Sequence, residues 1–184
     1  MNKAIFLDRD GTIIRHVDFL NKASQIRLLR GVARAIVSFK KLGFLVIIVT
    51  NQPIIAKGFC TFDDIDKVHE KMNKLLAQNG AKIDAVYICP HHPERGFKGE
   101  ISELKIECNC RKPKPGLLLQ AMKEHNISAN ESWMIGDKES DIIAGKNAGC
   151  RTILLTSEKR ISFEIMPHKI LSNLAEAVDY IVNN

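Results

Sequence analysis

The chain has 184 residues, of which 45% are hydrophobic and 26% are charged. This length suffices for one hydrophobic core and hardly for two, so we expect a single domain spanning residues 1–184. The net charge of +6 favours an anionic partner, which nucleic acid, an anionic surface and a phosphorylated metabolite would all satisfy. We expect no membrane-spanning helix and a cytoplasmic location, because no run of about 18 apolar residues occurs.

Apolar runs alternate with amphipathic segments along the chain. About five runs predict strands, near 4–7, 44–49, 83–88, 133–135 and 151–155. Helices are expected over 31–42, 62–80, 115–125, 139–148 and 172–182. Strands that alternate with helices are typical of a three-layer α/β/α fold with a parallel sheet.

The first strand runs directly into two carboxylates, Asp8 and Asp10. Carboxylates this close repel one another unless a cation lies near, which predicts a hard metal such as Mg²⁺. Asp8 is then expected to attack phosphorus, and Asp10 to protonate the leaving oxygen and later activate water. The alternative is an ordinary turn, because Asp-Gly is a common turn dipeptide.

Polar groups also follow other predicted strands. Thr50 and Asn51 end the second strand, Asp137 ends the fourth, and Lys112 lies between the third and fourth. A hydroxyl and an amide can hold phosphate oxygens, a lysine can neutralise a phosphoryl group, and a further carboxylate can complete a Mg²⁺ site. Each residue alone could also be a cap, a turn or a solvated side chain. Together, at strand ends, they predict a phosphoryl-transfer site.

The five cysteines form an odd set, which argues against a disulfide framework in a reducing compartment. Three of them and a histidine bracket the segment 89–116, as Cys89, His91, Cys108 and Cys110. Four such ligands predict a closed, structural zinc site. His92 is an alternative to His91, and cysteines that bind no metal are the alternative to the site as a whole.

Four short motifs together resemble those of the haloacid dehalogenase superfamily of phosphotransferases: Asp8-Arg9-Asp10-Gly11-Thr12, Thr50-Asn51, Lys112, and Gly136-Asp137 with Asp141. The resemblance implies a Rossmann-like sheet, with Asp8 as nucleophile and Asp10 as acid/base. It also implies Mg²⁺ held by Asp8, the backbone of Asp10, and Asp137, with Thr50 and Lys112 on the phosphate. No stretch is long enough for a large cap domain.

The cysteine segment is similar to the zinc loop of the heptose bisphosphate phosphatases, whose cousins are the histidinol-phosphate phosphatases. That resemblance implies a cytoplasmic enzyme of nucleotide-activated heptose synthesis that removes the 7-phosphate of D-glycero-D-manno-heptose 1,7-bisphosphate. Substrate contacts are expected from Asn51, Gln52, Arg111 and Lys138. Lys98 and Lys105, in the long stretch before Cys108, are available for a second phosphate.

Two alternatives to a heptose bisphosphate phosphatase remain open at this point. The chain departs from the family at Ile14, His16, Phe19 and the segment 53–58, which contact substrate in relatives. A histidinol-phosphate phosphatase is therefore the second reading. A zinc-stabilised nucleic-acid-binding module is the third, although aromatic residues are only 6% of the chain. The expected partner is a small phosphorylated sugar, with no nucleic acid or membrane, and we expect a monomer.

Overall fold

The computed structural model describes residues 1–158 and 162–184. Within these residues, six parallel strands form one sheet in the order β3-β2-β1-β4-β5-β6. The strands are β1 (Lys3–Leu7), β2 (Phe44–Asn51), β3 (Ala85–Cys89), β4 (Trp133–Gly136), β5 (Arg151–Leu155) and β6 (Lys169–Leu171).

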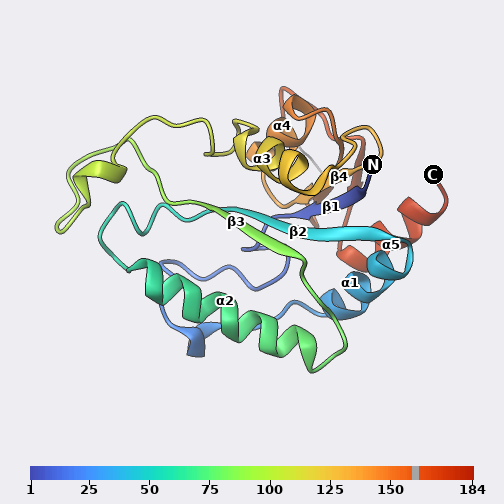
Figure 1. Ribbon diagram of the computed structural model, residues 1–184, viewed down its shortest axis with the longest axis horizontal. Coiled ribbons are helices and arrows are strands. Elements are labelled where there is room, and N and C mark those ends of the chain that lie inside the picture. The colour runs from blue at the N-terminus through green and yellow to red at the C-terminus, as the bar shows by residue number, and fades with distance from the viewer. Residues whose placement is uncertain (159–161) are drawn as a thin grey trace.

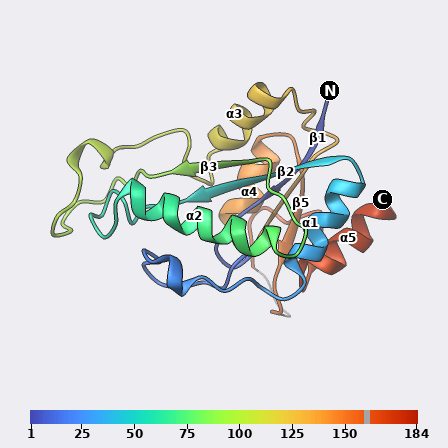
Figure 2. The same ribbon diagram turned by 60° about the horizontal axis from the view of Figure 1, so that its bottom comes forward.

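Helices cover both faces of the sheet (Figures 1 and 2). One face carries α1 (Val32–Lys41), α2 (Phe62–Ala77) and α5 (Leu174–Val182), and the other carries α3 (Gly116–His125) and α4 (Glu139–Asn147). Two short 3-10 turns, η1 (Ala23–Gln25) and η2 (Ser102–Leu104), lie in loops. The predicted three-layer α/β/α fold is confirmed.

The central strands are buried on both faces, as their unbroken apolar runs predict. From Ala4 to Leu7 every side chain of β1 is inaccessible to solvent, and Val46 to Val49 of β2 are equally buried. A capping box opens α2: the Thr61 hydroxyl accepts from the Asp64 amide at 3.2 Å, and the Asp64 carboxylate accepts from the Thr61 amide at 2.9 Å.

The sheet differs from the prediction at its two edges. The strand β6, missed by the sequence reading, pairs with β5 over three residues and is largely exposed, so it shows no apolar run. At the other edge, β3 occupies Ala85–Cys89 rather than 83–88. Cys89 is therefore the last residue of a strand, held in register beside Asn51.

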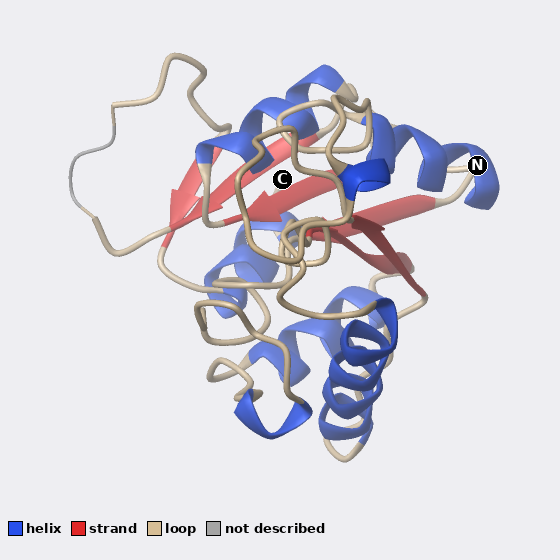
Figure 3. Ribbon diagram, turned by 90° about the vertical axis from the view of Figure 1, so that its left-hand side faces the viewer, coloured by secondary structure: helices blue, strands red, loops and turns tan. Residues whose placement is uncertain are grey.

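Loops gather at the carboxyl edge of the sheet, which faces the viewer in Figure 3. The loop after β2 packs there against the long segment 90–115, because the Ile101 amide donates to the Ala56 carbonyl at 3.0 Å. Gly58 has a φ of 74°, and a Cβ at this position would overlap the carbonyl of Gly99. Glycine at position 58 is thus required for the two loops to meet.

No helix in the described ranges, 1–158 and 162–184, has the length and apolar character needed to cross a membrane.

Candidate active site

The end of β1 delivers Asp8 into a buried position at the carboxyl edge, where its side chain is 8% exposed. The chain then turns sharply at Gly11, whose φ is 86°. A Cβ at Gly11 would overlap the carboxylate of Asp137, so the turn is also a close approach between the first motif and the end of β4. Two acidic strand ends that are far apart in sequence thereby become neighbours.

Lys112 lies between two carboxylates. Its Nζ is 2.7 Å from Asp8 Oδ1 and 2.6 Å from Asp141 Oδ1, and it also donates to the Val49 carbonyl at 2.8 Å. Burial alone would lower the pKa of Lys112, but Asp141 and Asp8 raise it above its usual value. The ammonium is therefore a fixed positive charge beside the predicted nucleophile, as the sequence predicted.

Asn51 places Lys112 by pairing with its backbone. The Asn51 Nδ2 donates to the Lys112 carbonyl at 3.0 Å, and the Lys112 amide donates to Asn51 Oδ1 at 3.0 Å. This reciprocal pair joins the end of β2 to the segment that precedes α3. The side chain of Asn51, expected on substrate, thus also holds the backbone of Lys112 in place.

Three carboxylates, from Asp8, Asp137 and Asp141, bring oxygen atoms within 4.8 Å of one another. Asp137 Oδ1 is buried without a hydrogen-bond partner among the described residues. Burial, followed by the charge of Asp8, raises the pKa of Asp137, and burial raises that of Asp141 to about 6 against the pull of Lys112. A hard divalent cation would relieve this repulsion, so the residues present fit Mg²⁺.

Asp141 belongs to this group because of local structure at the start of α4. Its Oδ2 accepts from the Lys138 amide at 3.1 Å, which caps the helix. A Cβ at Gly136 would overlap the Asp141 carboxylate, so the glycine at the end of β4 makes room for it. The sequence reading placed Asp141 in a motif but gave it no role in the site.

The carboxylate of Asp10 has other hydrogen-bond partners than those of Asp8 and Asp141. Arg9 grips its carboxylate, with Nε 3.1 Å and Nη2 2.9 Å from Oδ2, and the Gln52 Nε2 donates to the same oxygen at 3.0 Å. Gln52 also donates to the Thr50 hydroxyl at 2.9 Å. The amide of Gln52, expected on substrate, is therefore used to orient Asp10 and Thr50. The predicted contribution of Asp10 to a metal, through its backbone, stays a prediction.

Two adjoining cavities open at this edge. A small one of about 50 Å³ is lined by Asp8, Asp10, Thr50, Asn51, Lys112, Lys138, Ser140 and Asp141. A larger one of about 220 Å³ shares Asp10, Asn51 and Lys138 with it and extends to His16, Phe19 and Lys57. The small cavity is sized for a single charged group, and the larger one leaves room for the rest of a ligand.

Three residues that the sequence connected with substrate have other neighbours in the structure, and a substrate contact by Arg111 stays a prediction. Lys105 has a fully buried side chain, its Nζ 4.7 Å from the centre of the Phe97 ring and 3.6 Å from Glu100. Ile14 is fully buried in the core. Arg111 donates to the His91 carbonyl at 3.4 Å, and in the described part of the chain it is not among the residues lining the two cavities.

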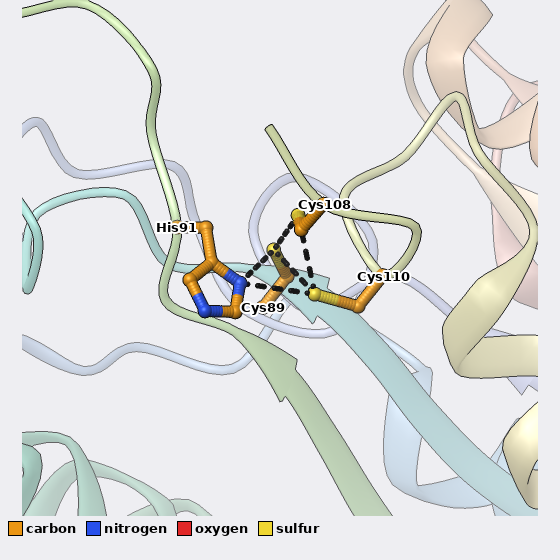
Figure 4. Close-up of side chains that lie close together, drawn as sticks. All are labelled: Cys89, His91, Cys108 and Cys110. Carbon is orange, nitrogen blue, oxygen red and sulfur yellow. Dashed lines mark hydrogen bonds between the residues drawn. The ribbon is translucent and has the colours of Figure 1, made fainter. Parts of the chain in front are cut away.

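The predicted zinc ligands come together at the base of the segment 90–115 (Figure 4). The Sγ atom of Cys110 lies 3.1 Å from that of Cys89 and 3.3 Å from that of Cys108, and 3.2 Å from His91 Nδ1. The edges of a tetrahedron with Zn–S bonds of about 2.3 Å measure roughly 3.5–3.8 Å, so the four atoms are close to the required spacing.

His91, rather than the alternative His92, joins this cluster. His92 is buried beside Phe97, with ring centroids 6.2 Å apart and its Nε2 3.8 Å from Glu94. The four ligands of the cluster leave no open coordination position, so a bound zinc ion would brace the loop rather than meet substrate. The residues present therefore fit structural zinc.

Comparison with known proteins agrees with this geometry. The HAD-hydrolase-like family model matches residues 109–177. The chain is 44% identical over 163 residues to the D-glycero-beta-D-manno-heptose-1,7-bisphosphate 7-phosphatase of Pasteurella multocida, covering 88% of this chain and 86% of that protein. It is 40% identical to the D-glycero-alpha-D-manno-heptose-1,7-bisphosphate 7-phosphatase of Burkholderia mallei, covering 88% and 83%.

Among solved structures, the chain is similar to the D,D-heptose 1,7-bisphosphate phosphatase of B. bronchiseptica, which was crystallised with magnesium and phosphate. The TM-score is 0.83 and the identity 28%, and 98% of each chain is covered. The family resemblance seen in the sequence is thereby confirmed. The chain belongs to the haloacid dehalogenase-like hydrolases, in the family that contains these heptose bisphosphate phosphatases.

Proposed function

We propose that this protein removes the 7-phosphate of D-glycero-D-manno-heptose 1,7-bisphosphate and leaves the 1-phosphate in place. One observation carries the proposal: the small cavity at Asp8 and Lys112 opens into a larger cavity lined by Lys57 and Lys138. The first holds a single phosphoryl group, and the second offers positive charge to a further phosphate. The names of the relatives at 35–44% identity support the same substrate class.

The chemistry follows from the positions of two carboxylates. A carboxylate oxygen of Asp8 attacks phosphorus, and the bond to the sugar oxygen breaks as Asp10 gives that oxygen its proton. Asp10, now ionised, takes a proton from water, whose oxygen attacks the phosphorus bound to Asp8. Inorganic phosphate leaves and the Asp8 carboxylate is regenerated.

The surrounding residues stabilise charge during both steps. Lys112 is fixed 2.7 Å from Asp8 Oδ1 and can neutralise charge on the transferring phosphoryl group. Thr50, which lines the small cavity, can donate its hydroxyl to a phosphate oxygen. Arg9 and Gln52 hold Asp10 at the cavity wall. We propose that Thr50, Asn51 and Lys138 complete the contacts to substrate.

Two metals fit the residues present. Asp8, the backbone of Asp10, and Asp137 would hold Mg²⁺, with the Asp141 carboxylate close by. Bound there, Mg²⁺ supplies positive charge that offsets the charge of the phosphoryl group. Cys89, His91, Cys108 and Cys110 would hold zinc, and the bound ion would fix the segment that carries Arg111 and Lys112 directly after the last ligand.

The larger cavity favours a doubly phosphorylated sugar over histidinol phosphate. Lys57 and Lys138 both line it, and the Lys57 Nζ lies 4.6 Å from the centre of the Phe97 ring, which restrains the ammonium. A ligand with one phosphate would fill the small cavity, which Lys138 also lines, and would leave Lys57 without a phosphate partner. Arg111 as a further phosphate ligand stays a prediction.

The test is a substrate panel read by phosphate release, with both anomers of the heptose bisphosphate, histidinol phosphate and sugar monophosphates. We expect the highest kcat/KM for one heptose bisphosphate anomer, and phosphorus NMR of the product should show loss of the 7-phosphate alone. Higher kcat/KM for histidinol phosphate would make the second reading correct. Release of the 1-phosphate would reverse the proposed orientation.

A further inference from the structure

A histidine and an arginine meet in the protein interior behind Asp10. His69 lies in the middle of α2 with 8% of its surface exposed, and its Nε2 is 3.1 Å from Nη1 of Arg9. A guanidinium has only donors, so Nε2 accepts and the ring proton lies on Nδ1. Burial, followed by the charge of Arg9, lowers the pKa of His69 to about 3. The imidazole is therefore a permanent neutral acceptor.

The same guanidinium reaches the active site with its other donors. Arg9 is 1% exposed, and its Nη2 lies 2.9 Å from Asp10 Oδ2, 3.2 Å from Asp10 Oδ1 and 2.8 Å from Gln52 Oε1. Nη1 is directed to His69 instead. The Arg9 guanidinium thus links Asp10, the proposed proton carrier, through Nη2 to His69 of α2 through Nη1.

We propose that His69 is a positioning residue that fixes the carboxylate of Asp10 through Arg9. Removing the acceptor at Nη1 would leave a buried donor without a partner, which costs free energy until the guanidinium moves to find another. Such a movement would carry Asp10 with it, because three contacts at 2.9 to 3.2 Å join the two side chains. The inference rests on the proposed role of Asp10 as acid and base.

The composition of α2 supports a specific role for this side chain. The helix buries Ile65, Val68, Met72 and Leu76 together with His69. Apolar residues are sufficient for core packing at such positions. A buried imidazole, by contrast, needs a hydrogen-bond partner to offset the free-energy cost of its desolvation. The observed partner is a charged group of the site, which explains a polar residue on the apolar face.

The test compares His69→Leu, which removes the acceptor, with His69→Gln, whose amide oxygen can accept from Nη1. A third variant, Met72→Ala, destabilises the same buried face but removes no hydrogen-bond partner of Arg9. kcat/KM is measured with the heptose bisphosphate and with 4-nitrophenyl phosphate. The parameter covers steps up to release of the alcohol, and nitrophenolate leaves without needing a proton from Asp10.

We expect His69→Leu to lower kcat/KM for the sugar phosphate by up to about 100-fold, and for the nitrophenyl ester by much less. His69→Gln should keep most of the activity. Met72→Ala should lower the thermal midpoint while leaving the ratio of the two kcat/KM values unchanged. In an Asp10→Asn background, His69→Leu should cost nothing further in kcat/KM for the sugar phosphate.

Equal losses for both esters, equal activity of the Leu and Gln variants, or full activity of His69→Leu would each overturn the inference. Failure of the proposed substrate is a separate result, visible as poor hydrolysis of the heptose bisphosphate by the unaltered protein. The same comparison is then made with the sugar monophosphate in the panel that the unaltered protein hydrolyses fastest, because positioning of Asp10 does not depend on which sugar leaves.

Discussion

Two clusters of metal-ligand residues stand at the same edge of the sheet and differ in almost every other respect. The carboxylates of Asp8, Asp137 and Asp141 line or adjoin a cavity and come from strand ends and a helix start. The thiols and the imidazole of the second cluster point toward one another, and their residues lie at the base of a long loop. Oxygen ligands beside a cavity suit a metal ion that meets substrate. Sulfur and nitrogen ligands that fill all four positions suit a structural zinc ion, which would act as a brace for the loop.

The two clusters are joined in sequence although they are separate in chemistry. Cys110 closes the thiol cluster, and Lys112 enters the carboxylate cluster two residues later. A mutation in the thiol cluster should therefore lower activity at the carboxylate cluster. A mutation in the carboxylate cluster should leave zinc binding by the thiol cluster unchanged.

The largest effect is expected from Asp8→Asn. Asparagine is nearly isosteric but cannot attack phosphorus, so turnover should fall to background. Lys112 keeps its contact with Asp141 at 2.6 Å, so the fold should persist. Phosphate release, thermal unfolding and elemental analysis on one preparation test this together. Substantial residual activity would exclude the covalent mechanism, and loss of zinc would show that the two clusters depend on each other in both directions.

Removal of Mg²⁺ should stop catalysis completely and reversibly. The carboxylate site is open to solvent through its cavities, so a brief exposure to chelator should empty it, and added Mg²⁺ should restore activity. Zinc should remain bound during the same treatment, because its thiolate ligands enclose it. Activity that survives thorough Mg²⁺ removal, with metal content checked by elemental analysis, would contradict the hard-metal site.

The Cys110→Ser variant should lose zinc, unfold at a lower temperature and show kcat/KM lower by on the order of tenfold to a hundredfold. The physical reason is that the ligand next to Arg111 and Lys112 no longer fixes that segment. Cys150→Ser is the matched control, since Cys150 is buried but is not one of the four clustered ligand residues. Zinc-free protein with unchanged activity and thermal midpoint would show that zinc does not hold the segment of Arg111 and Lys112 in place.

The smallest effect is expected at the rim of the larger cavity. Lys57→Met should raise KM for the bisphosphate by about tenfold, as for the loss of one charge-assisted contact worth roughly 1.5 kcal/mol, and should change KM for a monophosphate little. Lys123→Met is the control, because Lys123 is exposed on α3 and is not among the residues that line the two cavities. Equal effects on both substrates would mean that Lys57 does not bind the second phosphate.

The sequence was sufficient to predict groups that stand at strand ends. Asp8 and Asp137 are far apart in sequence, yet they meet because they follow β1 and β4, and the carboxyl ends of parallel strands share one edge. The four zinc ligands were also predictable, since soft ligands at both ends of one loop have few other uses. The edge strand β6 was missed because it is short, exposed and without an apolar run.

The parts that failed depend on how loops and side chains pack in three dimensions. Lys105 was expected to face substrate, but it is buried against Phe97, and no periodicity in a loop reports that. Arg9 was read only as part of a motif. His69 was detectable, because it falls four residues after Ile65 on the apolar face of α2. Its partner across the fold was not.

The reciprocal pair between Asn51 and the backbone of Lys112 has a consequence for the order of assembly. The two residues are 61 positions apart, so this contact forms only after a large loop of chain has closed. The strands β1 and β2 pair across a shorter separation, 41 positions from Lys3 to Phe44, so they can meet first. Lys112 therefore joins after the pair β1–β2, and a chain that has folded only that far carries Asp8 and Asp10 without the ammonium that neutralises them.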